Sequence, residues 1–188
     1  MKSYVVLDIE TTGLSKNRHK ITEIAAVKIK NKKIVDRFHS LVNPEVKIPS
    51  FITRLTGIDN KLVENEPLIH EILPNFLDFV KSEVIVAHNA TFDYGFIAKN
   101  CENHNLEFNN LKLCTRKLAN RLLTALPSKK LSCLCEHYNL TNEQAHRAMA
   151  DTLVTADIFA NFLNELSERN IEGQENVFKF ESSKIIRN

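Results

Sequence analysis

The sequence predicts an α/β domain in which a mixed sheet is flanked by helices. Three short apolar, β-branched runs open the chain, and apolar residues recur at helical steps of three and four from residue 68 onwards. Strands followed by alternating strands and helices favour a mixed sheet with helices packed on it. The 188 residues, 43% of them apolar and 26% charged, suit one globular domain and exclude a wholly disordered chain.

The first three strands are expected to form an antiparallel meander. Residues 4–9, 21–29 and 33–42 are the three apolar runs, and the first of them ends among acidic residues. The short turn Lys30-Asn31-Lys32 joins the second run to the third, which favours a hairpin.

The middle of the chain is expected to be helical around one buried strand. Residues 68–80 carry an apolar stripe typical of an amphipathic helix, which Pro74 should kink or restart. Residues 84–87 form a short apolar run typical of a buried strand. Asn89 or Thr91 is positioned to cap the helix that follows.

The last third is expected to hold one more strand and three helices. A strand near residues 111–114 should lead into a helix through about Leu126, and Ser132 should start a short helix. The long helix is expected over residues 147–168, and the mostly polar residues 171–188 beyond it should form a C-terminal tail. The first 170 residues are therefore expected to be one domain.

The composition favours a cytoplasmic protein without a membrane segment. No apolar run approaches the roughly 20 residues that span a bilayer, and the first residues do not resemble a secretory signal. We expect the four cysteines to be reduced thiols. The formal net charge of +2 identifies no partner by itself.

Asp8 and Glu10 are the first candidate functional residues. They lie two apart on a predicted strand, so their side chains leave the same face with Cα atoms roughly 7 Å apart. Two neighbouring carboxylates at the end of an apolar strand must take up a proton, pair with a base or bind a cation. The alternative is a solvated strand end where the chain turns at Gly13.

Asp93, Asp151 and His146 are the other candidates. Asp93 follows the strand at 84–87, where an acidic residue in the first turn of a helix often only complements the helix dipole. Asp151 lies early in the long helix, and His146 precedes it by five residues. Five residues correspond to about 500° of helical rotation, so His146 can approach Asp151 only from a loop at or before the helix start.

Taken together, these residues predict a divalent metal site. Four carboxylates offer the oxygen ligands that Mg²⁺ or Mn²⁺ prefers. Two such ions about 4 Å apart can bind the attacking and leaving oxygens of a phosphoryl displacement. A histidine, with an ordinary pKa of about 6.5, can accept the proton of the attacking water, which is the role expected for His146.

Three segments resemble the motifs of a known family. Residues Asp8-Ile-Glu10-Thr-Thr-Gly-Leu14, His88-Asn89-Ala-Thr-Phe92-Asp93 and His146-Arg-Ala-Met-Ala-Asp151 resemble, in order, spacing and residue type, the three motifs of the DEDDh 3′–5′ exonucleases. The resemblance runs from about residue 4 to about residue 166. It is strongest to the proofreading (epsilon) subunit or exonuclease domain of bacterial DNA polymerase III.

The resemblance implies a ribonuclease H-like fold and hydrolysis of single-stranded or frayed DNA 3′ ends to nucleoside monophosphates, with two Mg²⁺ or Mn²⁺ ions per site. It implies that Asp8 bridges both ions, that Glu10 and Asp151 complete one, and that Asp93 holds the second. His146 would be the general base, and Glu10 would also meet the terminal 3′-hydroxyl. The implied nucleic-acid contacts are the main chain at Thr11, the wedge Leu14, Asn89 and Thr56.

Two other functions stay open at this point. A relative with the same chemistry could trim RNA 3′ ends, and a non-catalytic module could use the fold to bind nucleic acid or a polymerase. The intact set of carboxylates weighs against a pure binder, because concentrated negative charge repels phosphates. A DNA polymerase is a candidate partner. A sliding clamp is not expected, since the segment Gln174-Glu-Asn-Val-Phe178 only loosely resembles a clamp-binding motif.

Overall fold

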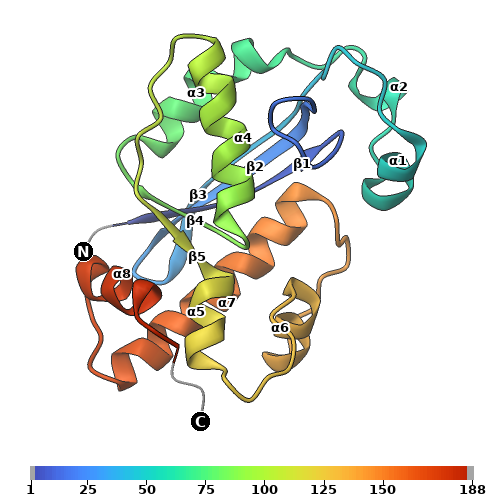
Figure 1. The fold of residues 1–188 in the computed structure, drawn as a ribbon. Coiled ribbons are helices and arrows are strands. Elements are labelled where there is room, and N and C mark those ends of the chain that lie inside the picture. Colours follow the sequence, from blue (N-terminus) through green and yellow to red (C-terminus); the bar gives the residue numbers. More distant parts are fainter. Residues whose placement is uncertain (1–2, 186–188) are drawn as a thin grey trace.

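The computed structural model describes residues 3–185 and has a five-stranded mixed sheet at its centre (Figure 1). The strand order is β3-β2-β1-β4-β5, with β1, β2 and β3 antiparallel and with β4 and β5 parallel to β1. This arrangement confirms the predicted meander and mixed sheet. The strands are β1 (Tyr4–Thr11), β2 (Ile21–Lys30), β3 (Lys33–Leu41), β4 (Val84–Ala87) and β5 (Lys112–Cys114).

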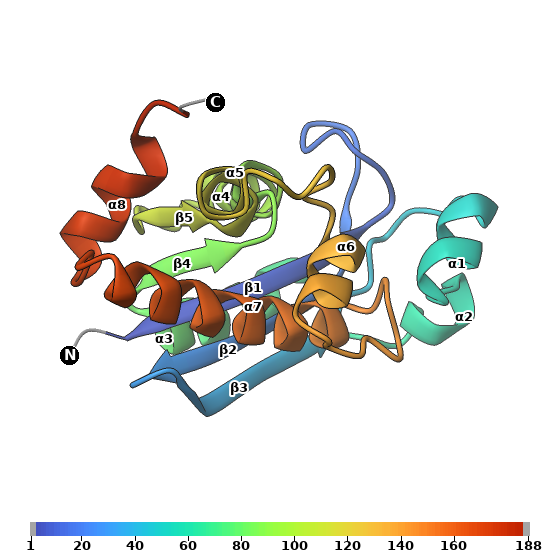
Figure 2. The same cartoon turned by 90° about the horizontal axis from the view of Figure 1, so that it is seen from below.

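Helices cover both faces of this sheet. The helices of the described residues are α1 (Ser50–Thr56), α2 (Asn60–Val63), α3 (Ile69–Val80), α4 (Ala90–Asn103), α5 (Thr115–Leu122), α6 (Leu131–His137), α7 (Ala148–Glu168) and α8 (Gln174–Ser182). Helix α7 lies along β1 and β2 (Figure 2), where it buries Tyr4 and Val6 of β1. Helices α3 and α4 bury Val5, Leu7 and Ile9 on the other face. This division follows from the alternation of side chains along a strand.

The strand register decides which groups meet at the end of β1. Asp8 lies opposite Ala25, and Glu10 lies opposite Glu23, so both acidic residues and Glu23 share the face covered by α7. On its other side, β1 pairs with β4 only as far as Val6. Beyond Val6, the main-chain groups of β1 on the side of β4 therefore have no strand partner and are free to bind side chains.

Two short helices, α1 and α2, were not predicted. They stand apart from the sheet at the end of the molecule opposite α8 (Figures 1 and 2). Their small apolar core is made by Ile48, Ile52, Ile58 and Val63. Helices of seven and four residues are too short to show a clear apolar period, so no pattern in the sequence indicates them.

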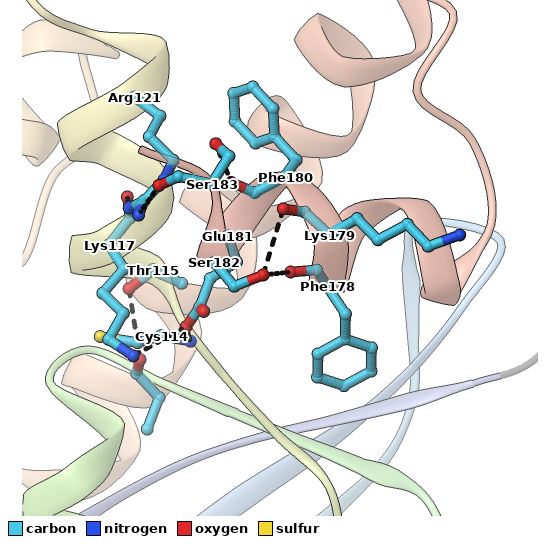
Figure 3. Close-up of polar contacts among 11 residues, drawn as sticks. Cys114, Thr115, Lys117, Arg121, Phe178, Lys179, Phe180, Glu181, Ser182 and Ser183 are labelled. Atoms are coloured by element: carbon cyan, nitrogen blue, oxygen red, sulfur yellow. Dashed lines mark hydrogen bonds and ion pairs between the residues drawn. The ribbon is translucent and has the colours of Figure 1, made fainter. Parts of the chain in front are cut away.

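Helix α8 lies within the stretch that was expected to be a polar tail. Its Val177 is buried in the core beneath α7, and Glu181 accepts a hydrogen bond from the main-chain N–H of Cys114 at 3.2 Å (Figure 3). Lys117 Nζ lies 3.6 Å from the same carboxylate. Packed structure therefore extends beyond residue 170, and α8 covers the edge strand β5. Only Val177 and Glu181 of this helix are buried, which leaves little apolar pattern in the sequence.

Two helices differ in detail from the prediction. Helix α3 continues through Pro74, so of the kink or restart predicted there the restart is wrong; Ile72, Leu73 and Phe76 pack into the core and hold the helix on both sides of the proline. Helix α5 ends at Leu122 rather than near Leu126, and of the residues that follow, Leu123 and Leu126 are only partly buried against the core. Within residues 3–185, no helix combines the length and the apolar character that crossing a membrane requires.

Candidate metal centre

Three carboxylates meet where β1 passes beneath the start of α7. Asp8, Glu10 and Asp151 each place one oxygen so that the three oxygens lie within 4.8 Å of one another. The strand supplies the first two from one face, and the first turn of α7 supplies the third. Three convergent, half-buried carboxylates form a site suited to a divalent metal ion, as the sequence predicted.

Asp93 approaches the same strand from the other side. It lies in the first turn of α4, is only 2% exposed, and accepts a hydrogen bond from the Ile9 N–H at 3.3 Å. That N–H is free because pairing with β4 has already ended. Asp93 is outside the three-residue cluster, but it is held at the residue between Asp8 and Glu10.

The electrostatics of these carboxylates favour protons or a cation. Burial, followed by the charges of Asp93, Glu10 and other neighbouring carboxylates, raises the pKa of Asp8 well above its ordinary value. Burial and the nearby charge of Asp151 raise the pKa of Glu10 to about 8. Burial also raises the pKa of Asp93 to about 7. A divalent cation would favour the ionised forms that burial and repulsion disfavour, so the donor set fits such an ion.

His146 lies on the loop before α7, as its spacing from Asp151 predicted. Helix α7 begins at Ala148, and the exposed His146 has a left-handed main chain with φ of 65°. Its N–H donates to Asp151 Oδ2 at 3.3 Å, while Asn142 Nδ2 donates to Asp151 Oδ1 at 2.6 Å. The loop is thus bound to one of the clustered carboxylates at both ends.

The sequence analysis missed two residues at this site, Asn142 and Glu23. Asn142 lies in a polar stretch without a motif, and nothing in the sequence singles it out. Glu23 is fully buried in β2 and hydrogen-bonded to Arg147, to the Ala148 N–H and to His39. A single acidic residue inside the apolar run at 21–29 was the available signal for Glu23.

The four predicted nucleic-acid contacts lie in different environments. Thr11 ends β1, and its hydroxyl donates to the Gly13 carbonyl at 2.8 Å. Leu14 is 85% exposed, and Asn89 is exposed at the start of α4 with φ of 72°. Thr56 is buried, and its hydroxyl already bonds two main-chain groups of α1 and the following turn. Direct contact by the Thr56 side chain is therefore not supported.

The loop that carries Leu14 is internally ordered. The main chain of Thr12 and Lys20 is bonded across its base, and the Ser15 N–H donates to His19 Nδ1 at 3.0 Å. A Cβ at Gly13 would lie 2.5 Å from the His19 ring, so only glycine allows this close approach. The loop holds Leu14 outward beside the end of β1.

Comparison with known proteins identifies the family. Residues 5–159 match the family model for exonucleases (RNase_T). The DNA polymerase III PolC-type of Caldanaerobacter subterraneus subsp. tengcongensis is 48% identical over 169 residues, which are 90% of this chain but only 12% of that protein. The DNA polymerase III subunit epsilon of Aquifex aeolicus is 36% identical over 165 residues, covering 87% of this chain and 82% of that one.

Solved structures agree with this match. Exonuclease X in complex with 5′ overhanging duplex DNA is 27% identical, with a TM-score of 0.77, and the match covers 95% of this chain and 99% of that one. The nuclease domain of 3′hExo, a DEDDh family member bound to rAMP, has the same fold at 20% identity and a TM-score of 0.74, over 87% of this chain and 92% of that one. The predicted ribonuclease H-like fold is confirmed. The chain belongs to the exonuclease family, as its three acidic motifs indicated.

Proposed function

We propose that this chain is a metal-dependent 3′–5′ exonuclease that removes nucleoside monophosphates from single-stranded or frayed DNA 3′ ends. The observation that carries the proposal is the convergence of Asp8, Glu10 and Asp151, with Asp93 beside them, in a member of the exonuclease family. Residues 1–170 carry this nuclease in the proposal, and α8 supports it at the edge of the sheet.

Each side chain has a defined task in the proposed reaction. Asp8, Glu10 and Asp151 would hold one Mg²⁺ or Mn²⁺ ion and Asp93, with Asp8, a second; when bound, such ions neutralise charge on the attacking and leaving oxygens of the phosphodiester. An imidazole nitrogen of His146 would accept the proton of the attacking water. His146 is exposed on its loop and so is open to a strand that approaches from solvent.

The substrate end would be read by groups at and near the end of β1. Glu10 and the main chain of Thr11 would meet the terminal 3′-hydroxyl, and the exposed Leu14 would press against the terminal base. Asn89, exposed at the start of α4, would contact the sugar or phosphate. Selection of unpaired ends would then follow from a site that accepts one strand at a time.

The proposed role is proofreading together with a DNA polymerase in the bacterial cytoplasm. Two similar proteins carry the name DNA polymerase III, one as a PolC-type protein and one as an epsilon subunit. The proposal includes no sliding clamp: Gln174 of the candidate motif lies in α8, and its side-chain amide donates to the Ser3 carbonyl at 3.1 Å.

A time course on matched, 5′-labelled DNA and RNA oligonucleotides tests this function. Duplex DNA with a paired or a mismatched 3′ end is included, each with Mn²⁺ and with EDTA. We expect a metal-dependent DNA ladder that is faster on single strands and mismatched ends. A ladder on RNA alone would replace the proposed substrate, and binding without any shortening would favour a non-catalytic module.

A further inference from the structure

We propose that Glu23 is a positioning residue for the exonuclease reaction: it fixes the start of α7 and thereby the placement of His146 and Asp151. This inference rests on the function proposed above. Glu23 extends from β2 at the register position opposite Glu10, and its side chain is 1% exposed. It therefore lies at the site without belonging to the cluster of oxygens that converge there.

The Glu23 carboxylate binds α7 through both of its oxygens. Oε1 accepts from an Arg147 terminal nitrogen at 2.8 Å, and Oε2 accepts from Arg147 Nε at 3.2 Å. Oε2 also accepts from the main-chain N–H of Ala148 at 2.9 Å, and His39 Nε2 lies 2.8 Å from Oε1. A bidentate guanidinium–carboxylate pair fixes the relative orientation of the two side chains as well as the distance between them.

Glu23 replaces the missing cap of this helix. Arg147 occupies the N-cap position of α7, and its own side chain makes no capping hydrogen bond. The first N–H groups of a helix need acceptors, and a negative charge there is also favoured by the helix dipole. A carboxylate from the sheet meets both needs and ties the helix start to β2. His146 and Asp151 flank this anchored position in the chain.

The anchor does not use the oxygens that would hold a metal ion. Asp151 also binds the loop, through Asn142 and the His146 N–H, and each of its carboxylate oxygens accepts one of these bonds. A cation bound at Asp151 would share those oxygens with the two hydrogen bonds. The bonds of Glu23 involve none of those oxygens, so they can hold the start of α7 whether or not the cluster binds a cation.

The test compares Glu23→Gln with a matched control, Glu181→Gln. Glu181 is also a buried carboxylate that accepts from a main-chain N–H and lies near a cation, but it serves α8 and β5, at the far edge of the sheet (Figure 3). Two quantities are measured: kcat and KM on a labelled single strand with Mn²⁺, and hydrogen exchange of peptides covering residues 142–150 in EDTA.

For Glu23→Gln we expect kcat to fall roughly 10- to 100-fold with KM changed less than about twofold, because misplacement of reacting groups costs rate rather than binding. Exchange over residues 142–150 should become faster. Glu181→Gln should leave both readouts unchanged, even where it lowers thermal stability.

A second variant keeps the inference testable if Glu23→Gln folds poorly. In Arg147→Gln the buried Glu23 carboxylate keeps its contacts with the Ala148 N–H and His39, so this variant is expected to fold, and it should reproduce both effects. The double variant should be no worse than the more impaired single variant if the two residues act as one unit. Wild-type kcat and wild-type loop exchange in these variants would overturn the inference. Failure of the proposed function looks different: the wild type would not shorten DNA, while the exchange difference in EDTA would remain.

Discussion

Two kinds of carboxylate lie at the same end of the sheet, the metal-binding set that includes Asp8 and Glu10 and the supporting residue Glu23, and they differ in their partners. Burial raises the pKa of Asp8 and of Glu10, and their neighbours are mainly other carboxylates. Burial alone would raise the pKa of Glu23 as well, but hydrogen bonds from Arg147, His39 and the Ala148 N–H outweigh it and lower that pKa. The partners, rather than burial, therefore separate a carboxylate suited to bind a cation from one that supports structure.

The largest effect is expected when the metal-binding set loses a member. Asp8→Ala should reduce the hydrolysis rate by orders of magnitude at saturating Mn²⁺, because the reaction depends on charge stabilisation at this cluster. Rates on labelled oligonucleotides measure this. Asp78→Ala, at an exposed position on α3, is the matched control and should retain wild-type activity. A rate of at least half the wild-type value in Asp8→Ala would reject the assignment.

His146 lies between the metal-binding set and Glu23: its N–H is bonded to Asp151, and the next residue in the chain, Arg147, is bound by Glu23. His146→Ala should lower kcat by about 10²- to 10⁴-fold and remove one limb of the pH–rate profile, as expected when a general base is lost. The exposed His70 on α3 provides the control substitution His70→Ala. An unchanged pH profile in His146→Ala would assign proton transfer to another group.

The sequence was informative about the metal-binding set because local patterns place its members. Asp8 and Glu10 share a face through strand alternation, and the helical angle between His146 and Asp151 predicted that the histidine precedes α7. Asp93 was recognised by its position after a buried strand. Each of these inferences needed only neighbouring residues.

The supporting residues could not be predicted in the same way, because their partners are distant in the sequence. Glu23 meets Arg147 across 124 residues, and only the register of β1 with β2 brings it to the site. Asn142 reaches Asp151 from a loop that has no regular pattern. Thr56 followed from the resemblance alone, and its burial depends on the unpredicted core of α1 and α2.

The dependence of the free energy of unfolding on pH tests the difference between Glu10 and Glu23 without a measurement of catalysis. Between pH 4.5, the ordinary pKa of a glutamic acid, and about 8, folded Glu10 keeps a proton that the unfolded chain has released. The free energy of unfolding in EDTA should therefore fall as pH rises through this range. We expect a Tm several degrees lower at pH 8.5 than at pH 6, since about 1 kcal/mol corresponds to roughly 2–4 °C in a domain of this size.

Added Mn²⁺ and two substitutions identify the carboxylates that cause the fall in Tm. Mn²⁺ should restore the Tm at pH 8.5, because the ion binds the folded, ionised cluster. Glu10→Gln should reduce the dependence on pH more than Glu23→Gln does, because the pKa of Glu23 is lowered and its charge acts only as one of those that raise the pKa of Glu10. A Tm in EDTA that is constant or rises from pH 6 to pH 8.5 would contradict the raised pKa of Glu10.

The smallest effect is expected at Leu14, which carries no charge and belongs neither to the metal-binding carboxylates nor to the residues that support them. Leu14→Ala should change the rate on single strands by less than about twofold, because the carboxylates and His146 are untouched. The rate on a mismatched duplex end, relative to the single strand, should fall roughly 5- to 10-fold, since the truncated side chain loses about 1 kcal/mol of apolar contact with the terminal base. The control is Leu111→Ala, another exposed leucine, 65% accessible, next to β5. An equal loss on both substrates would mean that Leu14 serves the chemistry, and an unchanged ratio would remove it from strand selection.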